Sequence, residues 1–221
     1  MILGLDTTGR DLKLGLTIEG GVRSRLFSND LRHSRQILPQ ILQFLEEEDE
    51  SLESVQALAF SQGPGSFTGL RIAVGVIQGL AYGLNLPVIP VPTMAMVAQA
   101  AGQQARVTRV LVAMHAREAE FYGAFYEGCD DVIPCLIGQA QVYTAEMLAN
   151  HDLASWSLAG DGVFLMEEQA DQTQGVIDIT SPDVQNLLQI AEAMLAAGEV
   201  VSALEAAPLY VRETVAQKSR Q

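Results

Sequence analysis

Cysteine and histidine are scarce in this 221-residue chain, and their spacing does not suit a metal site. Cys129 and Cys135 have no cysteine or histidine pair nearby, and His33, His115 and His151 are far apart from one another. Zinc sites are usually built from pairs of such residues about two to five positions apart, and a disulfide framework needs several cysteines. The sequence therefore predicts two reduced thiols and no metal bound by this chain alone.

Basic residues are also few. The chain has 13 lysines and arginines against 27 aspartates and glutamates, which gives a formal charge of −14 at pH 7. Because a surface this acidic repels phosphate backbones, we do not expect the chain alone to bind nucleic acid. It could still serve an assembly whose basic partner holds the nucleic acid. Hydrophobic residues make up 48% of the chain, which is enough for sizeable cores and excludes disorder as its general state.

Long uninterrupted apolar runs are missing as well. The segment Ile72–Pro92 is largely apolar, but Gln78, Asn85 and three prolines interrupt it. The part before Pro87 is short for a helix that crosses about 30 Å of hydrocarbon. The chain opens with MILGLDTT, which lacks the basic residues of a signal peptide and is typical of a strand. We therefore expect no membrane segment and a cytoplasmic protein.

The first hundred residues alternate between strand and helix patterns. Three strand patterns separated by short turns come first, then a helix whose apolar residues fall on one face, and then alternating strands and helices. This order predicts an α/β lobe with a mixed sheet. The expected strands are Ile2–Asp6, Leu12–Ile18, Val22–Ser28, Val55–Ser61 and Val88–Val91, and the expected helices start near Ser34, Thr68 and Thr93.

A change in composition at Gly102-Gln103-Gln104 predicts a domain boundary. We expect an N-terminal lobe over residues 1–102 and a C-terminal α/β lobe over 103–204, with 205–221 packing back on the first lobe. In the second lobe we expect strands at Arg109–Met114 and Phe121–Tyr126, helices at 144–150, 162–170 and 182–197, and a last strand or turn at 207–212.

Two loops in the first lobe have the residues of a nucleotide site. Asp6 ends the first strand, where it could act through Mg²⁺ or, as we favour, close the hairpin with an Asx-type turn. The loop Gly63–Gly69 follows a strand and opens a helix, as phosphate loops do. However, its glycine spacing and the absence of a Gly-Lys-Ser/Thr ending match neither standard phosphate pattern. Binding of an anion by the backbone amides alone stays open.

The helix after that loop carries glycine at every fourth position. Gly75, Gly79 and Gly83 therefore share one face, although each interior glycine costs up to about 1 kcal/mol relative to alanine. Either the helix is pressed on its own sheet, or a helix of another chain approaches it closely. The four acids Glu46–Asp49 at the end of the preceding helix are either a solvated end or a patch for a basic partner.

Several segments together resemble one known family. They are MILGLDTT, HSRQILPQI, SQGPGSFTGLRIAVGVIQGLAYGLNLPVIPVPT, VLVAMHAREAEFYGAFY and PLYVRETVAQK. Through these segments, which extend from the first strand to the tail, the chain is similar to the TsaB (YeaZ) family. The loop GPGSFTGLR with its glycine-rich helix is the most specific part, and residues 128–183 are the least similar.

The resemblance implies a fold and a role. Members of this family have the actin/sugar-kinase/Hsp70 fold, with two α/β lobes and mixed sheets. They act in adding the threonylcarbamoyl group to N6 of adenosine 37 in tRNAs that read codons beginning with A. TsaC-type enzymes make threonylcarbamoyl-adenylate, TsaD carries the metal and transfers the group, and TsaE is an ATPase of the complex. TsaB is the non-catalytic scaffold that dimerises with TsaD and activates it.

The resemblance also implies partners and a site. No cofactor is expected on this chain alone, while ATP and Mg²⁺ are used by the complex, and tRNA is met only through the complex. Family members pair with themselves or with TsaD through two helices of the first lobe, which here are 34–46 and 68–83. The implied partner interface consists of Ile37, Leu38, Ile41, Leu42, Leu45, Arg71, Ile72, Gly75, Val76, Gly79 and Gly83.

The chain departs from the family pattern in the second lobe. The family usually has Asp-Ala-Arg where this chain has His115-Ala116-Arg117, and a Gly-Thr-Gly-like turn is here Gly160-Asp161-Gly162. Both changes put in doubt any role tied to that aspartate. Two alternatives of another class stay open: an ATP-dependent kinase-like enzyme that uses Asp6 and the Gly63–Gly69 loop, and a glycoprotease-like peptidase, which the histidine spacing disfavours.

Overall fold

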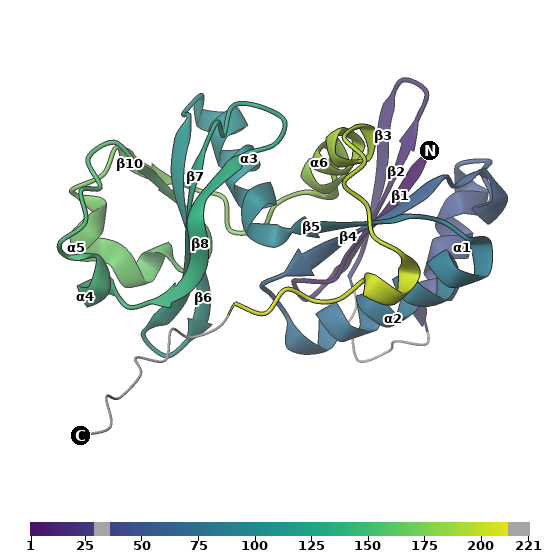
Figure 1. The fold of residues 1–221 in the computed structure, drawn as a ribbon, viewed down its shortest axis with the longest axis horizontal. Helices are drawn as coiled ribbons and strands as arrows, with labels where there is room; N and C mark the ends of the chain where they lie inside the picture. The colour runs from purple at the N-terminus through teal and green to yellow at the C-terminus, as the bar shows by residue number, and fades with distance from the viewer. Residues whose placement is uncertain (29–35, 212–221) are drawn as a thin grey trace. The chain divides into compact units, whose positions relative to one another are not determined.

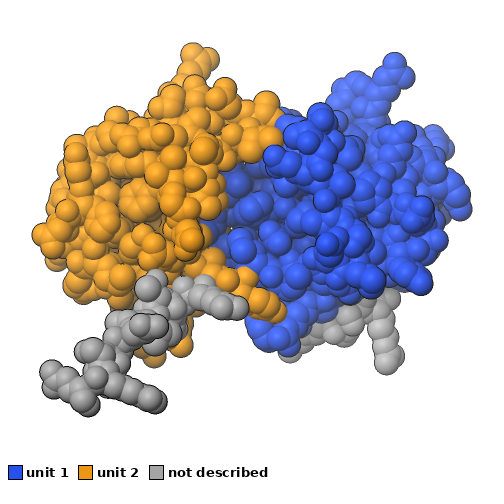
Figure 2. Space-filling view, in the orientation of Figure 1, with its two compact units in different colours: residues 1–96, 181–209 blue, residues 97–180, 210–221 orange. Residues whose placement is uncertain are grey.

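The computed structural model describes residues 1–28 and 36–211 of the chain. They form two compact units, coloured separately in Figure 2. Unit 1 consists of Met1–Met96 and Ser181–Leu209, and unit 2 of Val97–Thr180 together with Tyr210 and Val211. The division differs from the predicted one at both boundaries. The chain leaves unit 1 after Met96 rather than after residue 102, and it returns at Ser181 rather than near residue 205.

Unit 1 is built on a mixed five-stranded sheet with the order β3-β2-β1-β4-β5. Strands β1, β2 and β3 form an antiparallel meander, while β4 and β5 run parallel to β1. The meander and the two βα units are those predicted from the sequence. The strands are β1 (Ile2–Asp6), β2 (Leu12–Ile18), β3 (Gly21–Phe27), β4 (Ala57–Gly63) and β5 (Val88–Pro92).

Alternation along the strands assigns the two faces of this sheet. The leucines of β1 and β2 point to one face, where they pack with α1 (Ile37–Glu47) and α2 (Phe67–Leu84) in a single core. The glycines between them point to the other face, which α6 (Val184–Ala196) covers (Figure 1). A Cβ atom added at Gly4 or Gly15 would lie 3.0 or 2.8 Å from the side chain of Leu188. Helix α6 therefore belongs to unit 1, because only glycine lets it approach the sheet so closely.

The segment after α6 also packs on unit 1. The backbone amide of Leu209 donates to the carbonyl of Gln62 at 2.8 Å, and the side-chain amide of Gln78 donates to the carbonyl of Ala206 at 2.9 Å. These bonds hold the short helix η4 (Ala203–Glu205) and the residues after it against β4 and α2. Of residues 205–221, which were predicted to pack back on this lobe, those up to Leu209 do so, whereas Tyr210 and Val211 fall in unit 2. Residues 212–221 lie outside the described part, as does Ser34.

Unit 2 has a second mixed sheet, of order β10-β9-β6-β7-β8. The hairpin β6–β7 was predicted, but the three strands at the sides of the sheet were not. Strand β8 is mostly exposed, and β9 and β10 have three residues each, so none shows a hydrophobic period. The elements are α3 (Thr93–Ala105), which starts in unit 1, β6 (Arg109–Arg117), β7 (Glu120–Glu127), β8 (Cys135–Tyr143), α4 (Ala145–Leu148), β9 (Ser157–Ala159), η3 (Val163–Met166), α5 (Glu167–Ala170) and β10 (Gly175–Ile177).

Helix α2 is, by length and composition, the one described helix that could cross a membrane, with a mean hydropathy of 1.3 over its 18 residues. Part of its apolar surface packs inside unit 1. Leu70, Ala73, Ile77 and Ala81 recur at helical spacing and are buried in unit 1. This row of small and branched side chains forms the inner face of the helix against the sheet.

Candidate interaction surface

The glycines of the loop before α2 are explained by close packing within the chain. A Cβ atom at Gly65 would lie 2.6 Å from the Cβ of Thr8, and one at Gly69 would overlap the carbonyl oxygen of Thr7. Both threonines belong to the turn after β1. Glycine is needed at these positions because the loop and the turn touch backbone to backbone.

The amides of this loop are used to hold the same contact. The amide of Ser66 donates to the carbonyl of Thr8 at 2.8 Å, and the amide of Gly69 donates to Oγ of Ser66, the N-cap of α2, at 3.2 Å. The hydroxyl of Thr7 in turn donates to the carbonyl of Gly69 at 2.9 Å. Two of the loop amides, those of Ser66 and Gly69, are thus engaged by the chain itself.

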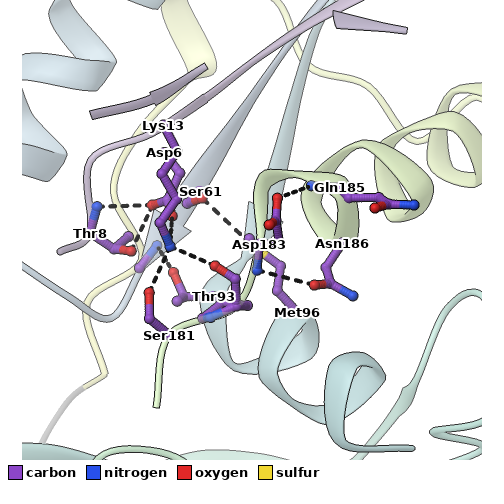
Figure 3. Close-up of polar contacts among 12 residues, drawn as sticks. Asp6, Thr8, Lys13, Ser61, Thr93, Met96, Ser181, Asp183, Gln185 and Asn186 are labelled. Carbon is purple, nitrogen blue, oxygen red and sulfur yellow. Dashed lines mark hydrogen bonds and ion pairs between the residues drawn. The ribbon is translucent and has the colours of Figure 1, made fainter. Parts of the chain in front are cut away.

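Asp6 closes the turn after β1, as the Asx-turn interpretation predicted (Figure 3). Its Oδ1 accepts from the amide of Thr8 at 2.9 Å and from the Thr8 hydroxyl at 2.6 Å. Its buried Oδ2 accepts no hydrogen bond from the part of the chain that the structure describes, and it lies 3.5 Å from Nζ of Lys13. That ammonium group donates at 2.6 Å to Oγ of Ser181 and to the carbonyl of Pro182, just before α6. Asp6 and Lys13 therefore tie the hairpin to the point where the chain returns to unit 1.

The glycines inside α2 have a different environment from those of the loop. At Gly75, Gly79 and Gly83 a Cβ atom would meet no atom of the described residues within 4 Å. They point away from the core face of the helix. At 100° per residue, their positions are rotated by about 140° to 220° around the helix axis from that of the buried Leu70. Packing on the chain's own sheet therefore does not explain them, and the outward face of α2 is a strip of bare backbone.

The implied interface residues of α1 divide into two groups. Ile37, Ile41 and Leu45 are buried in the core of unit 1, so their assignment to a partner interface is corrected by the structure. They occupy the positions of the helix that face the sheet. Leu38 and Leu42, in contrast, are 42% and 46% exposed and remain available to a partner.

Ion pairs show which side of α1 faces which neighbour. Glu47 and Glu48 pair with Arg25 and Arg23 of strand β3. Two of the four acids predicted to form a solvated end or a partner patch are thus engaged within the chain. The side of α1 that carries Glu47 faces β3, which is the edge strand of the sheet. Leu42 lies on the other side of α1, which therefore faces α2.

Three exposed residues beside the glycine strip were not predicted. Tyr82 is 76% and Leu204 of η4 is 82% exposed, and Phe67 at the start of α2 lies under the guanidinium of Arg71 at 3.9 Å. Tyr82 could have been found from the sequence, because it is seven residues after Gly75 and shares its side of the helix. No pattern in the sequence around Leu204 indicates its position, because it lies beside α2 only through the return of the chain to unit 1. We call Leu38, Leu42, Phe67, Arg71, Ile72, Gly75, Val76, Gly79, Tyr82, Gly83 and Leu204 the α2 surface.

The unusual residues of unit 2 have a structural role within their own lobe. The side chain of Asp161 accepts from the amide of His115 at 2.9 Å, and the His115 ring lies 5.6 Å from that of Phe164. A Cβ atom at Gly160 would overlap the carbonyl of Ala113, so this turn also needs glycine for a close approach to β6. Among the described residues, no group of three or more His, Cys, Asp or Glu side chains is placed to hold a metal ion.

Comparison with known proteins identifies relatives of the whole chain. A family model described as TsaD, tRNA N6-adenosine threonylcarbamoyltransferase, matches residues 17–220. The tRNA threonylcarbamoyladenosine biosynthesis protein TsaB of Escherichia coli (strain K12) is 33% identical over 223 residues, covering 98% of this chain and 96% of that protein. A tRNA N6-adenosine threonylcarbamoyltransferase of Nitrosomonas eutropha is 40% identical over 70 residues, which cover 32% of this chain and 20% of that enzyme.

A solved structure confirms the predicted fold. YeaZ from Pseudomonas aeruginosa superposes with a TM-score of 0.82 at 34% identity, covering 94% of this chain and 99% of that one. Two α/β lobes, each with a mixed five-stranded sheet, are thus the architecture of the chain.

Proposed function

Since the chain belongs to the TsaB (YeaZ) family of tRNA threonylcarbamoyladenosine biosynthesis proteins, we propose that it is the non-catalytic scaffold that dimerises with TsaD and activates it. In this role it serves the addition of the threonylcarbamoyl group to N6 of adenosine 37 in tRNAs that read codons beginning with A. The α2 surface is the part that contacts the partner, either TsaD or a second copy of the chain.

The observation that carries the proposal is the outward glycine strip of α2 with exposed apolar side chains beside it. Glycine at positions 75, 79 and 83 makes room for no other part of the described chain, and it costs helix stability. A bare backbone strip lets a second helix approach more closely than side chains would permit, which increases dispersion contacts between the helices. Leu38, Leu42 and Tyr82 then supply apolar area that association removes from water.

The charge of the chain supports an indirect role toward tRNA. A net charge of −14 repels a phosphate backbone, so tRNA is bound by other members of the complex. ATP and Mg²⁺ are likewise used by the complex, with TsaE as its ATPase, and the place of action is the cytoplasm. The kinase-like alternative is less well supported, because Asp6 and the amides of Ser66 and Gly69 are already engaged in holding the fold.

Reconstitution tests the proposal. Purified TsaC-, TsaD- and TsaE-type proteins are mixed with tRNA, threonine, bicarbonate and Mg-ATP, with and without this chain, and modified adenosine is quantified by mass spectrometry. We expect modification only when the chain is present, and none from the chain alone. Equal modification without the chain would exclude the scaffold role, and direct nucleotide binding would then be measured.

A pair of variants tests the surface separately. Gly79→Leu places a large side chain on the strip without an internal clash, so it should fold normally and fail to bind TsaD or to support modification. Gln104→Leu adds a leucine at an exposed position of α3 in unit 2 and should behave like the wild type. Normal binding of TsaD and of a second copy by a folded Gly79→Leu variant would exclude the α2 surface.

A further inference from the structure

Each of the two sheets has two edge strands among the residues that the structure describes, and three of these four edges are protected against pairing with another chain. Strand β3 carries Arg23 and Arg25 in ion pairs with α1, and β10 has only three residues. In β5, two prolines replace amide donors, and Val88 pairs with Val201 through two backbone hydrogen bonds. Charges, short strands, prolines and added segments are the usual ways in which proteins keep sheet edges from pairing.

The fourth edge, strand β8 of unit 2, has no such protection where it begins. Its sequence, CLIGQAQVY, contains no charged residue and no proline, and its outer side pairs with no other strand of the described chain. The uncharged run extends from Val132 to Ala145, although the net charge of the chain is −14. The start of β8 is therefore the edge at which another strand can add without displacing a segment of this chain.

Four exposed apolar side chains lie at this end of β8. Val132, Ile133, Leu136 and Ile137 are 50%, 41%, 40% and 44% exposed, and we call these four residues the β8 patch. Single exposed apolar residues are ordinary on a protein surface, whereas a group of four within six consecutive residues is typical of an interaction site.

Contacts with the rest of unit 2 hold the loop that carries the patch. The side-chain amide of Gln99 in α3 donates to the carbonyl of Val132 at 2.7 Å, and the amide of Cys129 donates to the carbonyl of Thr108 at 3.1 Å. A Cβ atom at Gly102 would overlap the carbonyl of Cys129, so α3 and the loop touch backbone to backbone. Because the exposed side chains stand on a fixed backbone, their association with a partner costs less entropy.

A bulge limits the regular part of this edge. Two positions of β7 that are two residues apart pair with Ile137 and Gln141, which are four residues apart. Gly138 lies within this bulge with a φ of 76°. Pro134, just before the strand, has no amide hydrogen. The stretch beside the patch at which a second strand can pair in regular register is therefore residues 135–137.

We propose that a second copy of this chain docks on the β8 patch, with the two β8 strands antiparallel about a two-fold axis at Leu136. Such an edge is complementary to itself, because in antiparallel pairing each strand offers the other the same backbone donors and acceptors. Since residues 132–145 carry no charge, two chains of charge −14 can meet there with little repulsion between them. A basic partner, in contrast, would find no acidic side chain along this stretch. The apolar side chains of both patches are removed from water.

Cysteine cross-linking tests the register. In a Cys135→Ser background, Leu136→Cys places one thiol opposite its copy across the axis, with Cβ atoms about 4.5–5.5 Å apart, so that a small adjustment permits a disulfide. We expect a disulfide-linked dimer after mild oxidation, measured by non-reducing electrophoresis. Val176→Cys in the same background is the matched control, because Val176 is also exposed but lies on β10 at the opposite edge of the same sheet. Equal cross-linking of the two variants, or of neither, would overturn the register.

Sedimentation equilibrium tests the patch itself. Gly79→Leu blocks the α2 surface, so the association that remains in this variant comes from another face. We expect it to dimerise still, and adding Ile137→Lys should raise the dissociation constant about tenfold or more, because lysine at a sheet edge opposes pairing. Val132→Lys is the second variant, for the case that Ile137→Lys unfolds the chain. Val176→Lys should leave the constant unchanged.

The outcomes are distinct from those of the proposed function, since the β8 patch and the α2 surface share no residue. A Gly79→Leu chain that stays monomeric, or that associates equally well with a lysine in the patch, would overturn the β8 contact and leave the scaffold role as it stands. Loss of TsaD binding in Ile137→Lys, with self-association unchanged, would overturn the second copy as the occupant. Failure of the reconstitution would remove the scaffold role without affecting the β8 contact.

Discussion

Replacement of Gly79 by alanine should stabilise the monomer and weaken its association. The Cβ atom of the new residue meets no atom of residues 1–28 or 36–211 within 4 Å, so no packing cost from them opposes the gain in helix propensity. Alanine is favoured over glycine in a helix interior by about 0.8–1 kcal/mol, and in a chain of this size that raises the melting temperature by roughly 2–4 °C. The free energy of unfolding is measured by urea denaturation at a concentration where the chain is monomeric, and association by sedimentation.

Gly69→Ala in the same helix is the matched control, and we expect it to lower the free energy of unfolding rather than raise it. Its Cβ atom would overlap the carbonyl oxygen of Thr7, so Gly69→Ala has to displace the turn after β1. Overpacking of this kind costs about 1–3 kcal/mol. If Gly79→Ala destabilised the monomer by a similar amount, the strip would be a packing surface of the chain itself, and the argument for an interface would fail.

Three further predictions concern the interior. Asp6→Ala leaves the ammonium group of Lys13 without its carboxylate, and urea denaturation should show a loss of about 1–3 kcal/mol, whereas an unchanged stability would contradict the anchoring role. In the native protein a maleimide should label exposed Cys135 and spare buried Cys129, and both should react after denaturation; rapid native labelling of both thiols would contradict the burial. Burial raises the pKa of Cys129 from 9.0 to about 12, so its neutral thiol favours the folded state below pH 9 and that contribution is lost as pH rises from 9 to 12. Unfolding titrations should show stability falling over this range, and falling less steeply in Cys129→Ala.

The local pattern of the sequence determined the element order of the first lobe and the inner faces of its helices. Alternating leucines indicated β2, and apolar residues at helical spacing indicated α1 and α2. The period of the apolar residues can be recognised because it equals the repeat of the backbone, which is about two residues in a strand and 3.6 in a helix. The distinctive loop and glycine strip also determined the family resemblance. The strands of unit 2 that are short or exposed carry no such period and were missed.

Tertiary structure alone decided which of these residues remain available to a partner. The glycines at 69 and 79 look alike in the sequence, yet one is pressed against the turn after β1 and the other faces open space. Ile41 and Leu42 are neighbours of similar character, yet one is core and the other surface. Helix α6 and Leu204 join unit 1 only because the chain returns to it at Ser181. A local pattern fixes the direction of a side chain on its own element, whereas its burial depends on segments that are distant in the sequence and cover it in the fold.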